Sequence, residues 1–313
     1  MLGFLRGFWL EGCHRREKGP VPRFTSTAKF GARIPDDEWD HSDYSAWDCR
    51  HGRVLLGDAY SCELLVWDPM TGCRRGLDWP NLADDRRGVA VLCAVTGCDH
   101  RTCHAAPFQV VFVGVEMGED EDDDDCAAFA CVSLPETGDW SKPCPPSEQW
   151  GEPCPLLHLP AEAFIRPIPP VLIQEALHFM IQSLKDDSEE ILNSSILMAM
   201  EDDSLGYAYV NGSTLYLWSR LMDSNGVASW SQRTIINLMN LLPIQNHAER
   251  ITVVGSVEGS DVVFVTMVLG IYEINVDSQR WKKLGKRENL DAVIPYMSFY
   301  NRQERVMPND VAH

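Results

Sequence analysis

The feature that most constrains the fold is a strand–turn–strand unit that recurs along the chain. Each copy is an apolar strand, a tight turn and a return strand, and the copies are residues 63–75, 128–140, 270–281 and a longer one that opens at 213–219, turns near 223–226 and returns from Trp230. The first two copies share a Thr-Gly pair in the turn. Turn residues between runs of β-branched and aromatic residues predict β-hairpins.

Additional strands precede each hairpin. They are residues 53–57, 109–114, 205–210 and 261–265, with 89–95 and 251–255 further upstream. Each unit therefore supplies about four short antiparallel strands, the size of one propeller blade. The strands are apolar at consecutive positions, as expected for sheets that are packed on both faces. We predict an all-β fold, a single β-propeller over residues 1–313 with about five or six four-stranded antiparallel blades. An irregular β-sandwich is the alternative.

One blade is expected to be incomplete. Residues 142–170 are rich in proline and are interpreted as a surface connection. Residues 171–184 favour a strand, although the residues after Gln174 also have helical preference. The segment ending at Asn193 continues directly into the strand-like residues 194–200, so no hairpin fits between them. We expect the neighbours of this blade to expose apolar faces, and residues 177–200 to be the least stable part of the ring. The ring is expected to close where residues 23–30 and 295–300 share a blade.

Composition excludes some classes of partner. The net charge is −19 and no basic patch is present, which argues against nucleic acid binding. No window approaches the roughly 20 apolar residues of a membrane span, so no membrane association is expected. The acidic residues 116–125 are interpreted as a solvated loop, with capture of a basic partner as the alternative. The 11 cysteines are odd in number and follow no signal peptide, which favours a reducing compartment, the cytoplasm or the nucleus.

Catalytic motifs are missing from the sequence, and we therefore predict no enzymatic activity, no catalytic residues and no cofactor. One group of zinc-ligand residue types gathers after a strand: Cys93, Cys98, His100, Cys103 and His104. Its spacing lacks the usual Cys-x2-Cys pair, so the prediction is that it binds no metal, with a metal site as the alternative.

Ten tryptophans invite a functional interpretation, but packing is the simpler one. Those at strand ends are expected to pack between blades, namely Trp67, Trp140, Trp218, Trp230 and Trp281. Half-buried packing in loops is expected for Trp39, Trp47, Trp79 and Trp150.

The order of several short segments resembles the plant F-box-associated β-propeller family. They are residues 47–56, 65–72, 90–93, 97–104, 107–113, 205–206, 215–219, 261–265 and 295–300, so the resemblance covers nearly the whole chain. No single segment is specific to the family. Members usually carry an F-box that binds the Skp-type adaptor of a cullin–RING ubiquitin ligase, while the propeller holds the protein to be ubiquitinated. The resemblance thus implies a substrate-recognition role.

Two departures from the family qualify this role. Residues 1–5 resemble the segment that normally follows an F-box, so this sequence is expected to lack the F-box and not to bind the adaptor by itself. The strand and return strand that family members carry after the position of Asn193 are missing. The hypothesis is a non-enzymatic protein-interaction module whose bound protein the sequence does not identify. The alternatives are a propeller with a small-molecule or metal site in its central channel, and a truncated receptor without present function.

Overall fold

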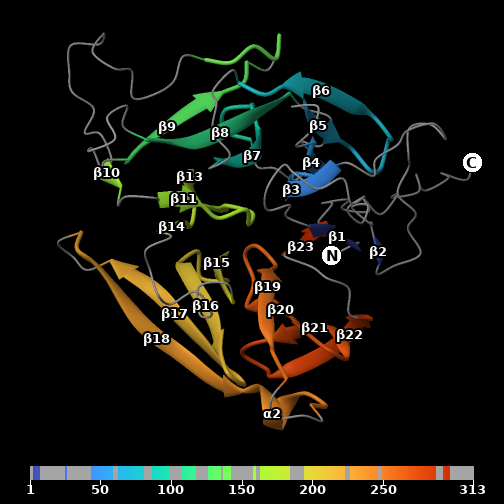
Figure 1. The fold of residues 1–313 in the computed structure, drawn as a ribbon, viewed down its shortest axis with the longest axis vertical. Coiled ribbons are helices and arrows are strands. Elements are labelled where there is room, and N and C mark those ends of the chain that lie inside the picture. The colour runs from blue at the N-terminus through green and yellow to red at the C-terminus, as the bar shows by residue number, and fades with distance from the viewer. Residues whose placement is uncertain are drawn as a thin grey trace, which may run out of the picture.

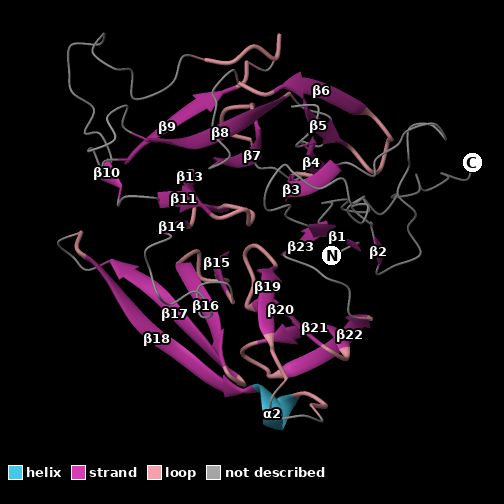
Figure 2. Ribbon diagram, in the orientation of Figure 1, coloured by secondary structure: helices cyan, strands magenta, loops and turns pink. Residues whose placement is uncertain are grey.

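The computed structural model arranges antiparallel sheets in a ring, with the strands nearest the middle lying side by side (Figure 1). It describes residues 3–7, 25–26, 44–58, 63–80, 87–98, 107–117, 126–134, 137–141, 158–159, 163–183, 194–222, 226–244, 249–286 and 292–296. Among these residues almost every element is a strand, and the short helix α2 (Leu238–Leu241) is the exception (Figure 2). The predicted fold class, an all-β propeller, is confirmed.

Four of the sheets are complete four-stranded blades. The β3–β6 blade comprises β3 (Tyr44–Arg50), β4 (Arg53–Asp58), β5 (Glu63–Trp67) and β6 (Arg74–Asp78). The β7–β10 blade comprises β7 (Arg87–Cys93), β8 (Phe108–Met117), β9 (Cys126–Val132) and β10 (His158–Leu159). The β15–β18 blade comprises β15 (Ser195–Ala199), β16 (Leu205–Asn211), β17 (Thr214–Met222) and β18 (Ala228–Asn237). The β19–β22 blade comprises β19 (Thr252–Ser256), β20 (Val262–Met267), β21 (Gly270–Asn275) and β22 (Arg280–Gly285).

Three smaller sheets fill the remaining positions of the ring. One joins β1 (Gly3–Gly7), β2 (Thr25–Ser26) and β23 (Ala292–Tyr296), and the other two pair β11 (Ala163–Ile165) with β14 (Ile181–Ser183) and β12 (Val171–Ile173) with β13 (Ala176–His178). About five or six four-stranded blades were predicted, and four complete ones are present, with the smaller sheets between them. The expected closure by both ends of the chain is present, because β2 and β23 share a sheet, although its middle strand, β1, was not predicted.

Two of the recurring hairpins turn in the same way. In the first, the amide of Gly72 donates to the Asp68 carbonyl (2.8 Å), and Gly72 has a φ of 81°. In the second, the amide of Gly138 donates to the Leu134 carbonyl (2.8 Å), and Gly138 has a φ of 84°. A positive φ at this position favours glycine, so the shared Thr-Gly pair in the sequence encodes a shared turn.

The hydrophobic core lies between the sheets rather than within one layer. The largest cluster, which includes Met198, Leu215 and Tyr272, packs the β15–β18 blade against the β19–β22 blade. A second joins the β3–β6 and β7–β10 blades, and further clusters join β23 to the blade on each side. Blades that are packed on both faces explain the consecutive apolar residues of their strands.

The incomplete part of the ring lies between the β7–β10 and β15–β18 blades, where β11–β14 form two short pairs (Figure 1). Gln174 and Glu175 have φ angles of 48° and 69° and form the turn between β12 and β13, so the helical alternative for this segment is wrong. Arg166 anchors these strands, because its Nη1 donates to the Ser195 carbonyl (2.9 Å) and to Ser195 Oγ (3.1 Å).

The prediction that residues 142–170 only connect two parts of the surface is wrong. Within residues 142–170, interpreted as a connection, β10 and β11 are strands. The return strand expected near Trp140 is reduced to a single bridge between Ser133 and Trp140, and β10 pairs with β9 as the outer strand instead. Its two-residue length explains why no sequence pattern revealed it.

Candidate functional site

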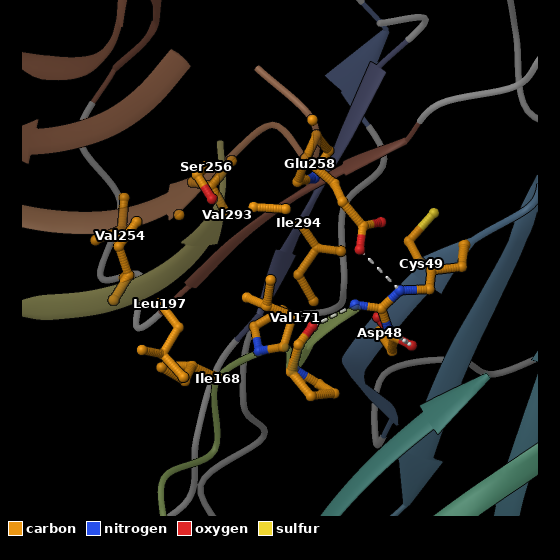
Figure 3. Close-up of a pocket in the computed structure, with 18 of the residues that line it drawn as sticks. Asp48, Cys49, Ile168, Val171, Leu197, Val254, Ser256, Glu258, Val293 and Ile294 are labelled. Carbon is orange, nitrogen blue, oxygen red and sulfur yellow. Dashed lines mark hydrogen bonds and ion pairs between the residues drawn. The ribbon is translucent and has the colours of Figure 1, made fainter. Parts of the chain in front are cut away.

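A pocket of about 270 Å³ lies where the inner strands of the ring meet (Figure 3). Most of its lining is aliphatic or proline side chains from β12, the segment before it, β15, β19 and β23: Ile168, Pro169, Pro170, Val171, Ile196, Leu197, Val254, Val293, Ile294 and Pro295. β3 contributes the polar end of the pocket through Asp48 and Arg50, and Glu258 completes it from the turn after β19.

Arg50 is the centre of that polar end. Its Nη1 lies 2.6 Å from Asp48 Oδ2, its Nε lies 3.3 Å from Glu258 Oε1, and its Nη2 donates to the Pro170 carbonyl. Asp48 Oδ2 also accepts from the amide of Val91 in β7 (2.9 Å). The Arg50 guanidinium thus ties β3 to the segment before β12 and to the turn after β19, and Asp48 ties β3 to β7, so the buried pair connects four positions in the ring.

The charge states of this group follow from burial and mutual attraction. Burial raises the pKa of Asp48 to about 6, and the attraction of Arg50, which acts in the opposite direction, does not cancel it. Burial lowers the pKa of Arg50, but the Asp48 and Glu258 carboxylates outweigh that effect and raise it above its ordinary value. Arg50 therefore stays cationic at every physiological pH, while Asp48 titrates between mildly acidic and neutral pH.

The arrangement indicates what the pocket can do. All three nitrogens of the Arg50 guanidinium, Nε, Nη1 and Nη2, already donate to acceptors. The carboxylates of Asp48 and Glu258 beside it repel an incoming anion. The rest of the lining offers apolar contact. Asp48 and Arg50 were missed as candidates in the sequence, where the signal was a pair of opposite charges two residues apart on an otherwise apolar strand.

A second candidate surface lies on the β15–β18 blade, on the face toward the incomplete sheets. The strand register places Tyr207 opposite Trp218 and Tyr209 opposite Tyr216, while Trp230 lies across from Arg220 on the same face. The rings of Tyr209 and Tyr216 stack with centroids 4.9 Å apart, and those of Tyr207 and Trp230 meet edge to face at 6.2 Å. We call these five aromatic residues the aromatic face.

The aromatic face is only partly covered. Its residues are half-buried or exposed, whereas Ala208, Leu215 and Leu217 on the opposite face are buried against the β19–β22 blade. At its inner end Val171 and Ile173 of β12 pack near Leu197 and Leu205. Further out, burial and the charge of Arg220 in β17 lower the pKa of His178 in β13, so β13 lies near β17. Trp230 is exposed, but Tyr207, Tyr209, Tyr216 and Trp218 are half-buried, so the exposure of an apolar face beside the incomplete blade stays a prediction.

Exposed apolar residues continue from this face onto the tip of the β17–β18 hairpin. Ten large apolar side chains are classed as exposed among the described residues, and five of them belong to this hairpin: Leu221, Met222, Val227, Trp230 and Ile235. Met222 and Val227, which flank the turn, are each 61 % exposed. This concentration on one hairpin differs from the scattered exposed apolar residues that any surface carries.

A group of carboxylates lies close to β18. Ligand atoms of Glu201, Asp261 and Asp277 all lie within 4.8 Å of one another, and this is the one such group of three metal-binding side chains in the described part of the chain. It borders a cleft of about 520 Å³ that is also lined by Arg233 and Thr234 of β18. Burial and the nearby Asp277 carboxylate raise the pKa of Asp261. The three residues lie in separate turns, so no sequence pattern linked them.

Two of the five residues in the cysteine–histidine group predicted to bind no metal lie among the described residues. Cys93 is half-buried at the end of β7, and Cys98, also half-buried, lies in the turn that follows. His100, Cys103 and His104 lie outside the described residues. The absence of metal at this group stays a prediction.

The acidic stretch 116–125 begins as a strand rather than a loop, because Glu116 and Met117 end β8 and pair with Ala127 and Cys126 of β9. The remainder, residues 118–125, lies outside the described residues.

The tryptophans divide differently from the prediction. Trp67 is buried, and Trp140 and Trp218 are half-buried, in agreement with packing. Trp230 and Trp281 are exposed at 47 % and 42 %, so their predicted burial between blades is wrong. Trp79 is buried and Trp47, which lies in β3 rather than a loop, is half-buried; Trp39 and Trp150 lie outside the described residues.

No protein-family model matches the chain, and no curated protein matches its sequence with significance. The likeness to F-box-associated propellers thus stays a prediction from the sequence. Among the described residues no helix has the length and hydropathy needed to cross a membrane.

Proposed function

We propose that the chain is a non-enzymatic protein-interaction module, a propeller that recognises a protein through the β17–β18 hairpin and the adjoining aromatic face. The observation that carries this proposal is the concentration of exposed apolar side chains, Met222 and Val227 foremost, on one hairpin beside partly covered aromatic rings. Contiguous apolar surface of this kind marks interaction sites on otherwise polar proteins. Tyrosine and tryptophan also anchor protein interfaces more often than other residues.

The sequence resemblance supplies the biological setting of the proposal. In F-box-associated propellers the ring holds the protein to be ubiquitinated, and an F-box contacts the adaptor of the ligase. We therefore propose a substrate-recognition role connected with a cullin–RING ligase in the cytoplasm or nucleus. The propeller described here is expected to bind its protein partner without binding the Skp-type adaptor.

The test begins with proximity labelling in cells, which identifies candidate partners, followed by binding measurements with purified candidates. The double variant Met222→Ser, Val227→Ser removes apolar surface from exposed positions, so folding is expected to be unaffected. It should weaken partner binding at least tenfold, about 1.4 kcal/mol. The matched control is Val268→Ser, because Val268 is equally exposed (59 %) but lies in the β20–β21 turn. Equal binding by all three proteins would contradict the proposal.

A second candidate function rests on the central pocket. Its volume of about 270 Å³ and its mainly aliphatic lining suit a small apolar molecule. Ligand-observed NMR with a library of apolar fragments tests this. Binding that is lost in a Leu197→Trp variant, which fills the pocket, would support the second function, and the absence of hits would remove it.

A further inference from the structure

The outer strand β18 differs from the outer strands of the other complete blades. Within the part of the chain that the structure describes it pairs only with β17, and it is ten residues long. An unpaired strand edge presents free backbone N–H and C=O groups, so proteins usually protect such edges by making them short or by placing charges along them.

The other outer strands carry these protections. β10 has two residues. β22 carries Arg280, Lys282 and Lys283 within six residues, and β6 carries Arg74 and Arg75 within five. In contrast, β18 has one charged residue in ten, Arg233, which lies at a β-bulge and pairs with Asp202. Residues 228–232, before the bulge, have no charge and form an open edge.

The surroundings of this edge indicate the chemistry of a matching segment. On one face, Trp230 and Tyr207 offer aromatic surface to an apolar side chain. Next to Thr234, the cleft lined by Glu201, Asp261 and Asp277 offers negative charge. Because Asp261 and Asp277 repel each other, a cationic side chain that enters the cleft relieves that repulsion.

We propose that β18 binds an extended segment of a partner protein as a fifth antiparallel strand, and that the segment combines apolar side chains with lysine or arginine. The inference rests on the proposed function, because it gives the partner of that function a binding mode and a chemistry. Backbone hydrogen bonds along the edge supply affinity, and the aromatic face and the acidic cleft select the side chains. A second copy of this chain fits less well, since each copy carries a net charge of −19 and would bring its own carboxylates to the shared edge.

The test uses a randomised decapeptide display library that is selected on the immobilised protein. A variant with Ser229→Lys and Gln232→Lys serves for counter-selection, because lysines along an edge oppose strand addition and repel a basic segment. The control variant is Val268→Lys, which adds the same side chain at an exposed turn away from β18. Thermal unfolding of all three proteins establishes that each is folded.

The expected result is enrichment of peptides that alternate apolar residues with lysine or arginine. They should bind the unmodified protein and Val268→Lys equally, and the Ser229→Lys, Gln232→Lys variant at least tenfold more weakly. Hydrogen exchange should show slower exchange of amides in residues 228–232 when the peptide is bound. Enrichment of acidic peptides, of peptides with helical periodicity, or of none at all would overturn the inference, and so would a β18-dependent dimer in sedimentation experiments.

The outcome also separates this inference from the proposed function. A natural partner whose binding is weakened by Met222→Ser, Val227→Ser but unchanged by Ser229→Lys, Gln232→Lys docks on the hairpin without adding a strand. The proposed function would then stand and the inference would fail. If neither variant affects partner binding, both are wrong.

Discussion

Replacing Arg50 by methionine tests whether the polar group at the centre of the ring holds the sheets together. Methionine replaces the apolar stem of arginine but ends short of the guanidinium, so it loses the bonds to Asp48, Glu258 and Pro170. The side chains of Arg50 and Asp48 are only 4 % and 2 % exposed, so the variant leaves a carboxylate without its cation in the interior. Removing one partner of a buried ion pair costs about 3–5 kcal/mol, and we expect a loss of stability in that range near neutral pH.

Urea unfolding of the purified protein measures the effect. Arg233→Met is the matched control, because Arg233 and Asp202 form a pair that is 42 % and 48 % exposed. Such an exposed pair contributes about 0–1 kcal/mol. The double variant Asp48→Asn, Arg50→Met should be more stable than Arg50→Met alone, because it no longer buries an unpaired charge. A loss below about 1 kcal/mol for Arg50→Met, or additive effects of the two single changes, would refute the assigned role.

Three other predictions concern the titration of Asp48, the packing at Gly255 and the local stability of the small sheets. The folded-state pKa of Asp48, about 6, lies above the ordinary value of 3.8, so the protonated form of Asp48 favours folding. Relative to Asp48→Asn, the wild-type protein should lose about 2 kcal/mol of stability as pH rises from about 4 to 7. Gly255→Ala should lower the free energy of unfolding in urea by about 1–3 kcal/mol, because its Cβ would lie 2.2 Å from the Val293 carbonyl oxygen. In hydrogen exchange, amides of β12 and β13 should exchange before those of β20 and β21, and equal protection would show that the small sheets are as stable as a complete blade.

The strands that could be predicted are those whose signal is local. The hairpins of the β15–β18 and β19–β22 blades follow directly from apolar runs separated by turn residues, as in residues 270–281. The turn at Gly72 was also readable, because its φ of 81° calls for glycine. Each of these features depends on residues within one short segment, where propensity and turn chemistry act together.

The unpredicted parts depend on contacts between distant residues. β1 completes the closing sheet by pairing with β23, about 290 positions away, and its own five residues show no alternation that would identify it. The two residues of β10 gain strand geometry only by pairing with β9. Residues 177–200, predicted as one unstable segment, belong to two different parts of the ring. Ser195–Ala199 forms β15, the inner strand of a complete blade, and only the preceding strands belong to the small sheets.

The candidate site could not be predicted either, because it also depends on contacts between residues that are distant in the sequence. Arg50 and Glu258 are 208 residues apart, and only closure of the ring brings them to 3.3 Å. The sequence showed opposite charges at Asp48 and Arg50 but not that both are buried. A pair of charges on a strand is usually a solvated pair, and burial depends on which strands of the ring surround them.

The incomplete sheets and the exposed hairpin have a common physical origin. A four-stranded blade at that position would cover more of its neighbour, whereas β12 packs against the inner strands of the β15–β18 blade and only the short strand β13 lies near Arg220 of β17. The polar bonds from Arg166 to Ser195 and from Arg50 to Pro170 hold this position without outer strands. Extending the small sheets outward should therefore stabilise the ring and block partner binding together, because one surface serves both. If a grafted hairpin stabilised the protein without affecting binding, the partner would have to use another face.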